Sequence, residues 1–220
     1  MNTVAIAGAS GVVGVRALDY LLERDDVNRV IAIGRRTLPQ QHPKLVSRVA
    51  DLQSKAAIAS AIAEQVGIAV CCLGTTIKTA GSKEAFRTVD RDAVVAFADA
   101  ALDKGAQRFL LVSSIGANAR SGNFYLKTKG EAEDAVARLA YRQLTIVRPS
   151  FIDDQGARRE YRAKERLTLP LARRVFSVVG RTNRYAPISA DQIGKALARL
   201  AFDHTTERLR IVESDELHAL

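Results

Sequence analysis

The sequence predicts an α/β fold of the Rossmann type: a doubly wound, mainly parallel sheet with helices on both faces and a small C-terminal lobe on the substrate side. Three observations predict it. Short β-branched runs alternate with longer stretches of helical periodicity. Residues 68–73 are apolar throughout, as in a strand buried on both faces. Three glycines, Gly8, Gly11 and Gly14, separate the first expected strand from the first expected helix.

The expected elements follow in order along the chain. Apolar runs predict strands at residues 3–7, 30–33, 44–49, 68–73, 108–113 and 144–147. Helical spacing predicts helices at residues 12–23, 53–64, 83–104 and 127–141. Pro149 ends the sixth strand, and the chain then loosens into a loop with one basic helix interrupted at Pro170. A helix at 190–201, capped by Ser189, and a strand at 209–212 complete the expected fold.

We expect a single domain over residues 1–220, with 1–150 as the cofactor-binding core and 151–220 as the small lobe with its closing helix and strand. No apolar run approaches the roughly 20 residues that a membrane-spanning helix needs. The first residues enter a strand-like pattern directly, without a secretory signal. The two cysteines, Cys71 and Cys72, are adjacent and suit core packing on opposite faces of a strand. These observations predict a cytoplasmic protein.

The formal net charge is +9, and much of the excess lies in the basic segment, residues 158–174. This segment predicts a solvated helical face, or a contact surface for a phosphate-bearing ligand or a protein partner. Tyr161 is its only aromatic residue and no nucleic-acid-binding signature accompanies it, so no nucleic-acid partner is expected. The three histidines are scattered, so no metal site is expected.

The glycine-rich turn predicts a dinucleotide site. Gly8 permits a tight turn, Gly11 lets the backbone approach a pyrophosphate, and Gly14 allows close packing of helix on sheet. The spacing is G-x-x-G-x-x-G, so the middle glycine is displaced by one from the usual G-x-G-x-x-G. The helix start offers free N–H groups to the phosphates. The cofactor contacts expected here besides the glycines are Ser10, Val12 and Val13.

Arg35 and Arg36 follow the second expected strand, where an acid would bind the ribose 2′-hydroxyl of NAD. Two guanidinium groups suit a 2′-phosphate instead, so NADP(H) is favoured over NAD(H). Further cofactor contacts are expected at other strand ends, because open α/β sheets bind ligands there. These residues are Asp51, Leu52, Leu73, Gly74, Thr75 and Pro149.

Tyr125 and Lys129 lie four residues apart at an expected helix start, so they share one face of that helix. A nearby ammonium favours the phenolate and lowers the pKa of a tyrosine, which suits Tyr125 to donate and accept a proton. Lys129 is also placed to hydrogen-bond the nicotinamide ribose. Ser113 and Ser114 end the fifth expected strand, and either hydroxyl is suited to polarise a substrate carbonyl.

The glycine-rich turn, the two arginines after the second expected strand, the strand-end serines and the Tyr125–Lys129 pair occur together in this chain. In this combination the sequence resembles the short-chain dehydrogenase/reductase superfamily in its atypical or extended branch, and it is most similar to the HIV Tat-interacting protein 2 family. The resemblance implies a Rossmann fold and NADP(H) binding. It also implies roles in hydride chemistry: Tyr125 as acid and base, Lys129 as its tuning residue, and Ser113 or Ser114 as the carbonyl-polarising group. The matching stretches are residues 8–14, 34–36, 71–76, 89–92, 113–117, 125–131 and 148–149.

Three functions remain open on the sequence. The first is an NADP(H)-dependent oxidoreductase acting on a small carbonyl or alcohol substrate, favoured because Arg35, Tyr125, Lys129 and the strand-end serines occur together. The second is an NADP(H)-binding sensor or scaffold with little turnover that uses the basic segment as its contact surface. The third is an epimerase-like enzyme with tightly bound cofactor. The expected helices at 83–104 and 127–141 also suit a homodimer.

Overall fold

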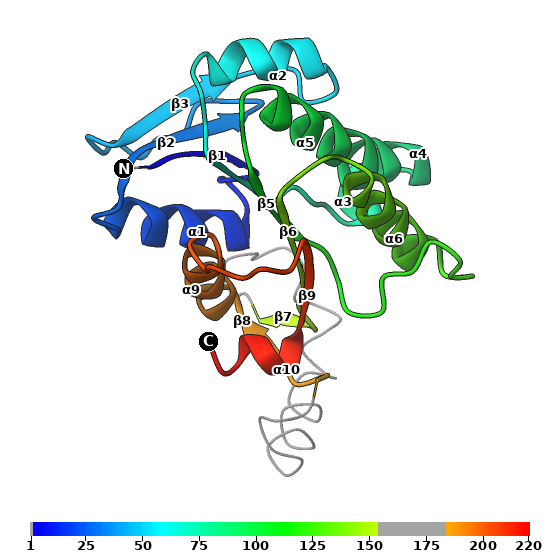
Figure 1. Ribbon diagram of the computed structural model, residues 1–220. Helices are drawn as coiled ribbons and strands as arrows, with labels where there is room; N and C mark the ends of the chain where they lie inside the picture. The colour runs from blue at the N-terminus through cyan, green and yellow to red at the C-terminus, as the bar shows by residue number, and fades with distance from the viewer. Residues whose placement is uncertain (1, 154–183) are drawn as a thin grey trace.

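The computed structural model describes residues 2–153 and 184–220. Within these residues, seven parallel strands form one sheet in the order β3-β2-β1-β4-β5-β6-β9 (Figure 1). This order and direction confirm the predicted Rossmann-type sheet. The strands are β1 (Asn2–Ala7), β2 (Val27–Gly34), β3 (Leu45–Val49), β4 (Ile68–Cys71), β5 (Arg108–Val112), β6 (Gln143–Arg148) and β9 (Leu209–Glu213).

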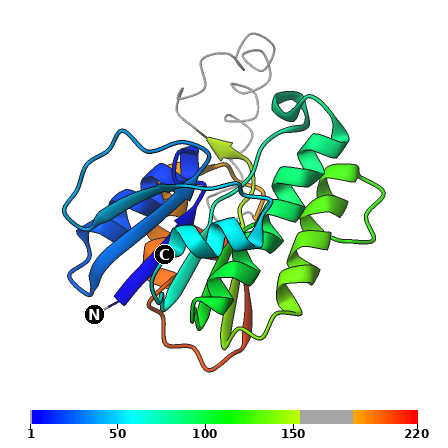
Figure 2. The same cartoon turned by 90° about the horizontal axis from the view of Figure 1, so that it is seen from above.

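Helices cover both faces of the sheet, because successive strand residues point to opposite sides and both sides are apolar. The helices α1 (Val12–Glu23), α9 (Ala190–Leu200) and α10 (Ser214–Leu217) lie on one face. The helices α2 (Lys55–Ile62), α5 (Ala93–Asp103) and α6 (Phe124–Ala137) lie on the other. Figure 2 shows these last three helices side by side over the sheet. Among the described residues, no helix has the length and apolar character needed to cross a membrane.

The two cysteines pack as predicted, on opposite faces. Cys71 ends β4 and belongs to the core beneath α5 and α6, whereas Cys72 packs against the core beneath α1 and α9. Burial raises the pKa of the Cys71 thiol to about 12, so this group stays protonated at neutral pH.

The expected helix at 83–104 differs from the structure in its middle. It is divided into α4 (Lys83–Arg87), a π-helical turn over Thr88–Asp92, and α5. A π-helical turn contains one more residue than an α-helical turn, so it changes which side chains face inward. Here the turn holds Asp90, whose side chain is fully buried.

Other boundaries also differ from those expected. The helix expected at 127–141 begins earlier, at Phe124, because the Asn123 side chain accepts a hydrogen bond from the Leu126 N–H. The short helix α3 (Ile77–Ala80) was not expected, nor was the small parallel pair of β7 (Ile152–Asp153) and β8 (Ile188–Ser189). The predicted cap of α9 is present, since the Ser189 hydroxyl accepts from the Gln192 N–H. The basic segment and Pro170 lie outside the described residues.

The chain after residue 184 completes the layer that α1 begins. Gly194 in α9 lies so close to α1 that an added Cβ would be 2.5 Å from the Arg16 Cβ. A glycine is therefore required where the two helices cross. This contact supports the helix that follows the glycine-rich turn.

Candidate functional site

The candidate site lies at the carboxyl ends of β1 and β4, where the direction of winding reverses. β1 pairs with β2 on one side and with β4 on the other. The chain leaves β1 toward α1 on one face of the sheet and leaves β4 toward α5 on the other (Figure 1). Open α/β sheets bind ligands at such a switch point, because the two loops diverge and leave room between them.

The glycine-rich turn lies on one side of this site, and two of its glycines, Gly8 and Gly14, are required sterically. Gly8 has a φ of +81°, and an added Cβ would lie 2.5 Å from the carbonyl carbon of Cys72 in the opposite loop. The Gly11 N–H donates to the Gly8 carbonyl at 2.9 Å. An added Cβ on Gly14 would lie 2.0 Å from the same carbonyl oxygen. The first turn of α1 holds no acid and no side chain caps it, which leaves its amide groups for an anion.

Arg35 and Arg36 lie at the end of β2 and are both exposed. Within the described part of the chain, neither guanidinium forms a hydrogen bond or an ion pair. Asp51 follows β3, is also exposed, and accepts a hydrogen bond from the Gln53 N–H at 3.0 Å. The carboxyl end of the sheet thus carries two uncompensated cations where a ribose phosphate would lie.

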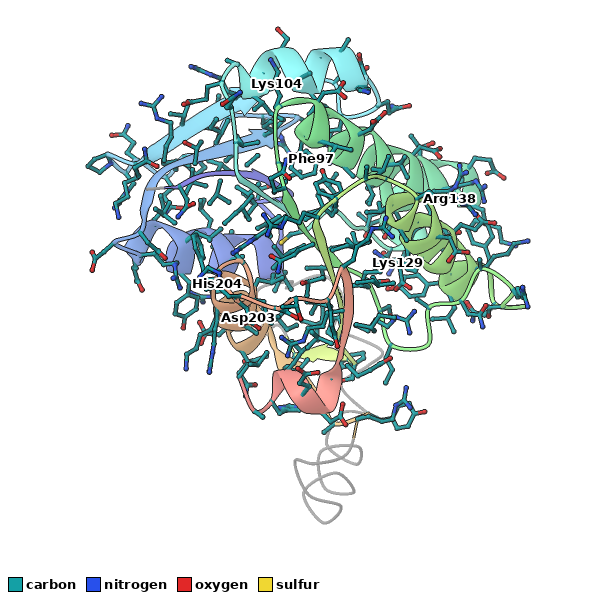
Figure 3. All side chains as sticks on the ribbon, viewed as in Figure 1. Phe97, Lys104, Lys129, Arg138, Asp203 and His204 are labelled. Atoms are coloured by element: carbon teal, nitrogen blue, oxygen red, sulfur yellow. The ribbon has the colours of Figure 1, made fainter. Side chains whose placement is uncertain are left out.

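Tyr125 and Lys129 occupy the first two turns of α6, and Lys129 is buried (Figure 3). The Tyr125 side chain is partly buried, and its ring centroid is 5.5 Å from that of Phe86. Lys129 is only 6% exposed. A lysine this deeply buried needs a counter-ion, because desolvation strongly disfavours an unpaired ammonium.

The counter-ion is Asp90, which sequence reasoning missed. Its Oδ1 lies 2.7 Å from the Lys129 Nζ, and its Oδ2 accepts a hydrogen bond from the Thr75 N–H at 2.8 Å. Gly74 passes over the pair: an added Cβ would lie 3.4 Å from both the Asp90 Oδ1 and the Lys129 Nζ. The only sequence signal was the stretch at 89–92, which contributed to the family resemblance but carried no role of its own.

Electrostatics keep Lys129 charged. Burial alone would lower its pKa, but the Asp90 carboxylate more than reverses this effect and holds the pKa above its usual value. For Asp90, burial raises the pKa of the carboxyl, and the Lys129 ammonium and the Thr75 amide oppose that rise. The geometry, with a cation on one oxygen and an amide donor on the other, is that of a carboxylate.

Ser113 and Ser114 follow β5 at the same edge of the sheet. The Ser113 N–H continues the ladder by donating to the Val147 carbonyl, and its hydroxyl is buried without a hydrogen-bond partner among the described residues. The Ser114 side chain is partly buried, and its hydroxyl makes only a long contact of 3.4 Å to the Ile115 carbonyl. Both hydroxyls therefore retain hydrogen-bonding capacity.

The loop after the serines is held against α6. An added Cβ on Gly130 would lie 2.2 Å from the Ala119 nitrogen, so only glycine allows this contact. The Ile115 N–H donates to the carbonyl of Pro149, which is buried. These contacts fix the serine loop relative to the helix that carries Tyr125 and Lys129.

Comparison with known proteins agrees with this arrangement. A family model described as NAD(P)H-binding matches residues 8–204. The chain is a member of this NAD(P)H-binding family. Residues 8–204 include the glycine-rich turn, the loop after β4 and α6, so the match covers all of the candidate site.

Individual relatives of this NAD(P)H-binding protein confirm the resemblance drawn from the sequence. It is 35% identical over 154 residues to the rat protein HTATIP2, covering 69% of this chain and 63% of the relative. It is 34% identical over 202 residues to the mitochondrial protein fmp52 of Emericella nidulans, covering 89% and 85%. An oxidoreductase of the short-chain dehydrogenase/reductase family from Burkholderia thailandensis superposes with a TM-score of 0.69 at 20% identity, covering 99% and 93%. MoeE5, solved with UDP-glucose and NAD, superposes with a TM-score of 0.69 at 16% identity, covering 99% and 80%.

The expected cytoplasmic location is wrong. The fmp52 relatives of Emericella nidulans and Eremothecium gossypii are named mitochondrial, and the second aligns with 100% of this chain at 29% identity. The expectation failed because the sequence observations behind it argued only against the secretory route.

Proposed function

We propose that this protein is an NADP(H)-dependent oxidoreductase that interconverts a small carbonyl compound and its alcohol. The observation that carries the proposal is the placement of Tyr125 and a buried, charged Lys129 on one face of α6, at the same sheet edge as the glycine-rich turn. A proton-transfer group and a dinucleotide cradle thus share one site.

The residues present fit a dinucleotide. Gly8 and Gly14 leave no room for a Cβ, which lets the turn pack tightly, and the uncapped start of α1 is open to a pyrophosphate. The guanidinium groups of Arg35 and Arg36 suit a 2′-phosphate. Neither forms an ion pair with another described residue, so binding a phosphate would break no such pair. NADP(H) is therefore the preferred cofactor.

A nicotinamide dinucleotide held by the glycine-rich turn would supply hydride chemistry at the substrate carbonyl carbon. Tyr125 donates its hydroxyl proton to the carbonyl oxygen, and the phenolate that results lies near the Lys129 ammonium. One of the strand-end hydroxyls, Ser113 or Ser114, donates a hydrogen bond to the same carbonyl oxygen and polarises it. In the reverse direction Tyr125 accepts the alcohol proton.

Calorimetric titration tests the cofactor assignment. We expect NADPH to bind more tightly than NADH, and Arg35→Ala to weaken NADPH binding about 10- to 100-fold, because a charge-assisted hydrogen bond contributes about 1.5–3 kcal/mol. NADH binding should not change. Arg142→Ala removes an equally exposed arginine at the opposite end of the sheet and serves as the matched control. Equal affinity for both dinucleotides would contradict the assignment.

A screen of aldehydes and ketones with NADPH tests the reaction. For any compound that is reduced, Tyr125→Phe should lower kcat by about 10²- to 10⁴-fold, the usual contribution of a general acid. The variant should bind NADPH as the wild type does. Undiminished turnover by Tyr125→Phe would refute the role of Tyr125.

A further inference from the structure

The stability of the fold does not by itself explain why Asp90 and Lys129 form a buried ion pair. Replacing a buried ion pair by apolar side chains is often neutral or stabilising, so such a pair is weak evidence for a role in stability. Asp90 also lies on a π-helical turn, a local irregularity that occurs frequently at functional sites. Both observations direct attention to what Asp90 does for the groups around it.

Asp90 joins three segments that are separate in the sequence. One oxygen contacts Lys129 on α6, and the other accepts from the backbone of Thr75 in the loop after β4, which lies at the candidate site. Gly74, next to Thr75, covers the pair at van der Waals distance. The position of the ammonium is therefore set by a carboxylate that is itself anchored at its second oxygen.

We infer that Asp90 is the positioning residue of the proposed reaction: it fixes the Lys129 ammonium beside Tyr125 and ties it to the loop after β4 at the candidate site. The inference rests on the proposed function. Before the reaction the ammonium is balanced by Asp90. When Tyr125 gives its proton to the carbonyl oxygen, the new negative charge appears beside a cation that cannot move away.

The charged and titratable groups that face Lys129 come from three elements. They are Asp90 on the π-helical turn, Tyr125 on α6 itself, and Cys71 at the end of β4. The Cys71 thiol is neutral at working pH. Asp90 is therefore the only fixed negative charge among these groups, and its removal leaves a buried ammonium without a counter-ion. The pKa of Lys129 must then fall, because burial alone lowers it.

The test compares Asp90→Asn with Asp92→Asn. The amide introduced by Asp90→Asn keeps an oxygen that can accept from the Thr75 N–H but loses the charge. Asp92 lies two residues on and is exposed on a surface pair with Arg91, so its variant controls for the same chemical change in the same turn. The protonation of Lys129 is followed by the ¹³Cε chemical shift, assigned by its loss in Lys129→Met.

We expect Asp90→Asn to lower the pH at which Lys129 titrates by at least about one unit, and to move the alkaline limb of the kcat profile down with it. At neutral pH kcat should fall about tenfold or more, whereas NADPH affinity should change less than about threefold. Asp90→Glu should restore the alkaline limb. Asp92→Asn should behave as the wild type.

Titration of Lys129 at the same pH in Asp90→Asn and wild type overturns the inference, as does an unchanged kcat profile. If Asp90→Asn does not fold, the wild type alone decides: titration of Lys129 at or below the usual pH of a lysine overturns the inference. Failure of the proposed function is recognised separately. If Lys129→Met retains full turnover, Lys129 has no part in the reaction; if it is inactive while the Asp90→Asn profile is unchanged, only the role of Asp90 is refuted.

Discussion

Replacing the second and third glycines of the turn, one at a time, should separate the stability of the fold from the binding of the cofactor. An added methyl group on Gly14 would stand 2.0 Å from the Gly8 carbonyl oxygen, whereas on Gly11 it would stand 3.2 Å from that oxygen. Gly14 faces the packed interior of the turn. Gly11 needs only a small adjustment of its neighbour, and its free side faces the candidate site.

The magnitudes follow from these distances. In Gly14→Ala the turn and α1 must separate by roughly 1 Å to reach normal contact. Overpacking costs about 1–3 kcal/mol, and a contact as short as 2.0 Å belongs in the upper part of that range, about 2–3 kcal/mol. About 1 kcal/mol is recovered because alanine favours a helix over glycine. We expect a net loss of about 1–2 kcal/mol, or roughly 2–8 °C in Tm. Gly11→Ala should change stability by less than about 1 kcal/mol.

For cofactor binding, in contrast to stability, we expect Gly11→Ala to have the larger effect. The methyl group of Gly11→Ala occupies the space where a pyrophosphate approaches the backbone, so NADPH affinity should fall at least about tenfold. Thermal unfolding and calorimetric titration on the same samples measure both effects. Gly67→Ala, whose added Cβ would meet no atom within 4 Å, should change neither. A Gly11→Ala protein that binds NADPH normally, or a Gly14→Ala protein as stable as the wild type, would refute the reasoning.

Two further substitutions test the scaffold around the site. Gly194→Ala should lower the free energy of unfolding by about 1–2 kcal/mol in urea, because its methyl would be 2.5 Å from a side chain of α1; an unchanged midpoint would contradict the close helix crossing. Glu133→Gln should lower the free energy of unfolding by about 1–3 kcal/mol, because it removes the charge from a largely buried ion pair with Arg148. The loss is limited because Glu213 still contacts Arg148. Glu64→Gln, in an exposed pair, should cost less than about 1 kcal/mol, and an equal loss in the two variants would refute the role of burial.

The sheet could be predicted well from the sequence because its signals are local. Each expected strand is an apolar run closed by a turn residue, and the alternation with helices implies parallel strands. The glycine-rich turn was recognisable for the same reason, since Gly8, Gly11 and Gly14 lie within seven residues. The structure leaves no room for a side chain at Gly8 and Gly14, whereas a Cβ on Gly11 would need only a small shift of the Gly8 carbonyl.

Asp90 could not be predicted because its role depends on contacts across the chain. Regular helical spacing over 83–104 gives no reason to turn a carboxylate inward, and the π-helical turn that does so has no clear sequence signal. Its partners, Thr75 and Lys129, are 15 and 39 residues away. The roles of Ser113 and Ser114 likewise stay predictions, since both hydroxyls are available at the end of β5.

The crossing of α1 and α9 has a consequence for the order in which the protein can be made. The glycine-rich turn and α1 leave the ribosome long before the helix that packs on them, because α9 begins only at Ala190. Until then one face of the early strands lacks part of its apolar cover. The glycine-rich turn therefore becomes firmly supported only after α9 has been synthesised. Contacts of such long sequence separation slow folding and leave apolar surface exposed during synthesis.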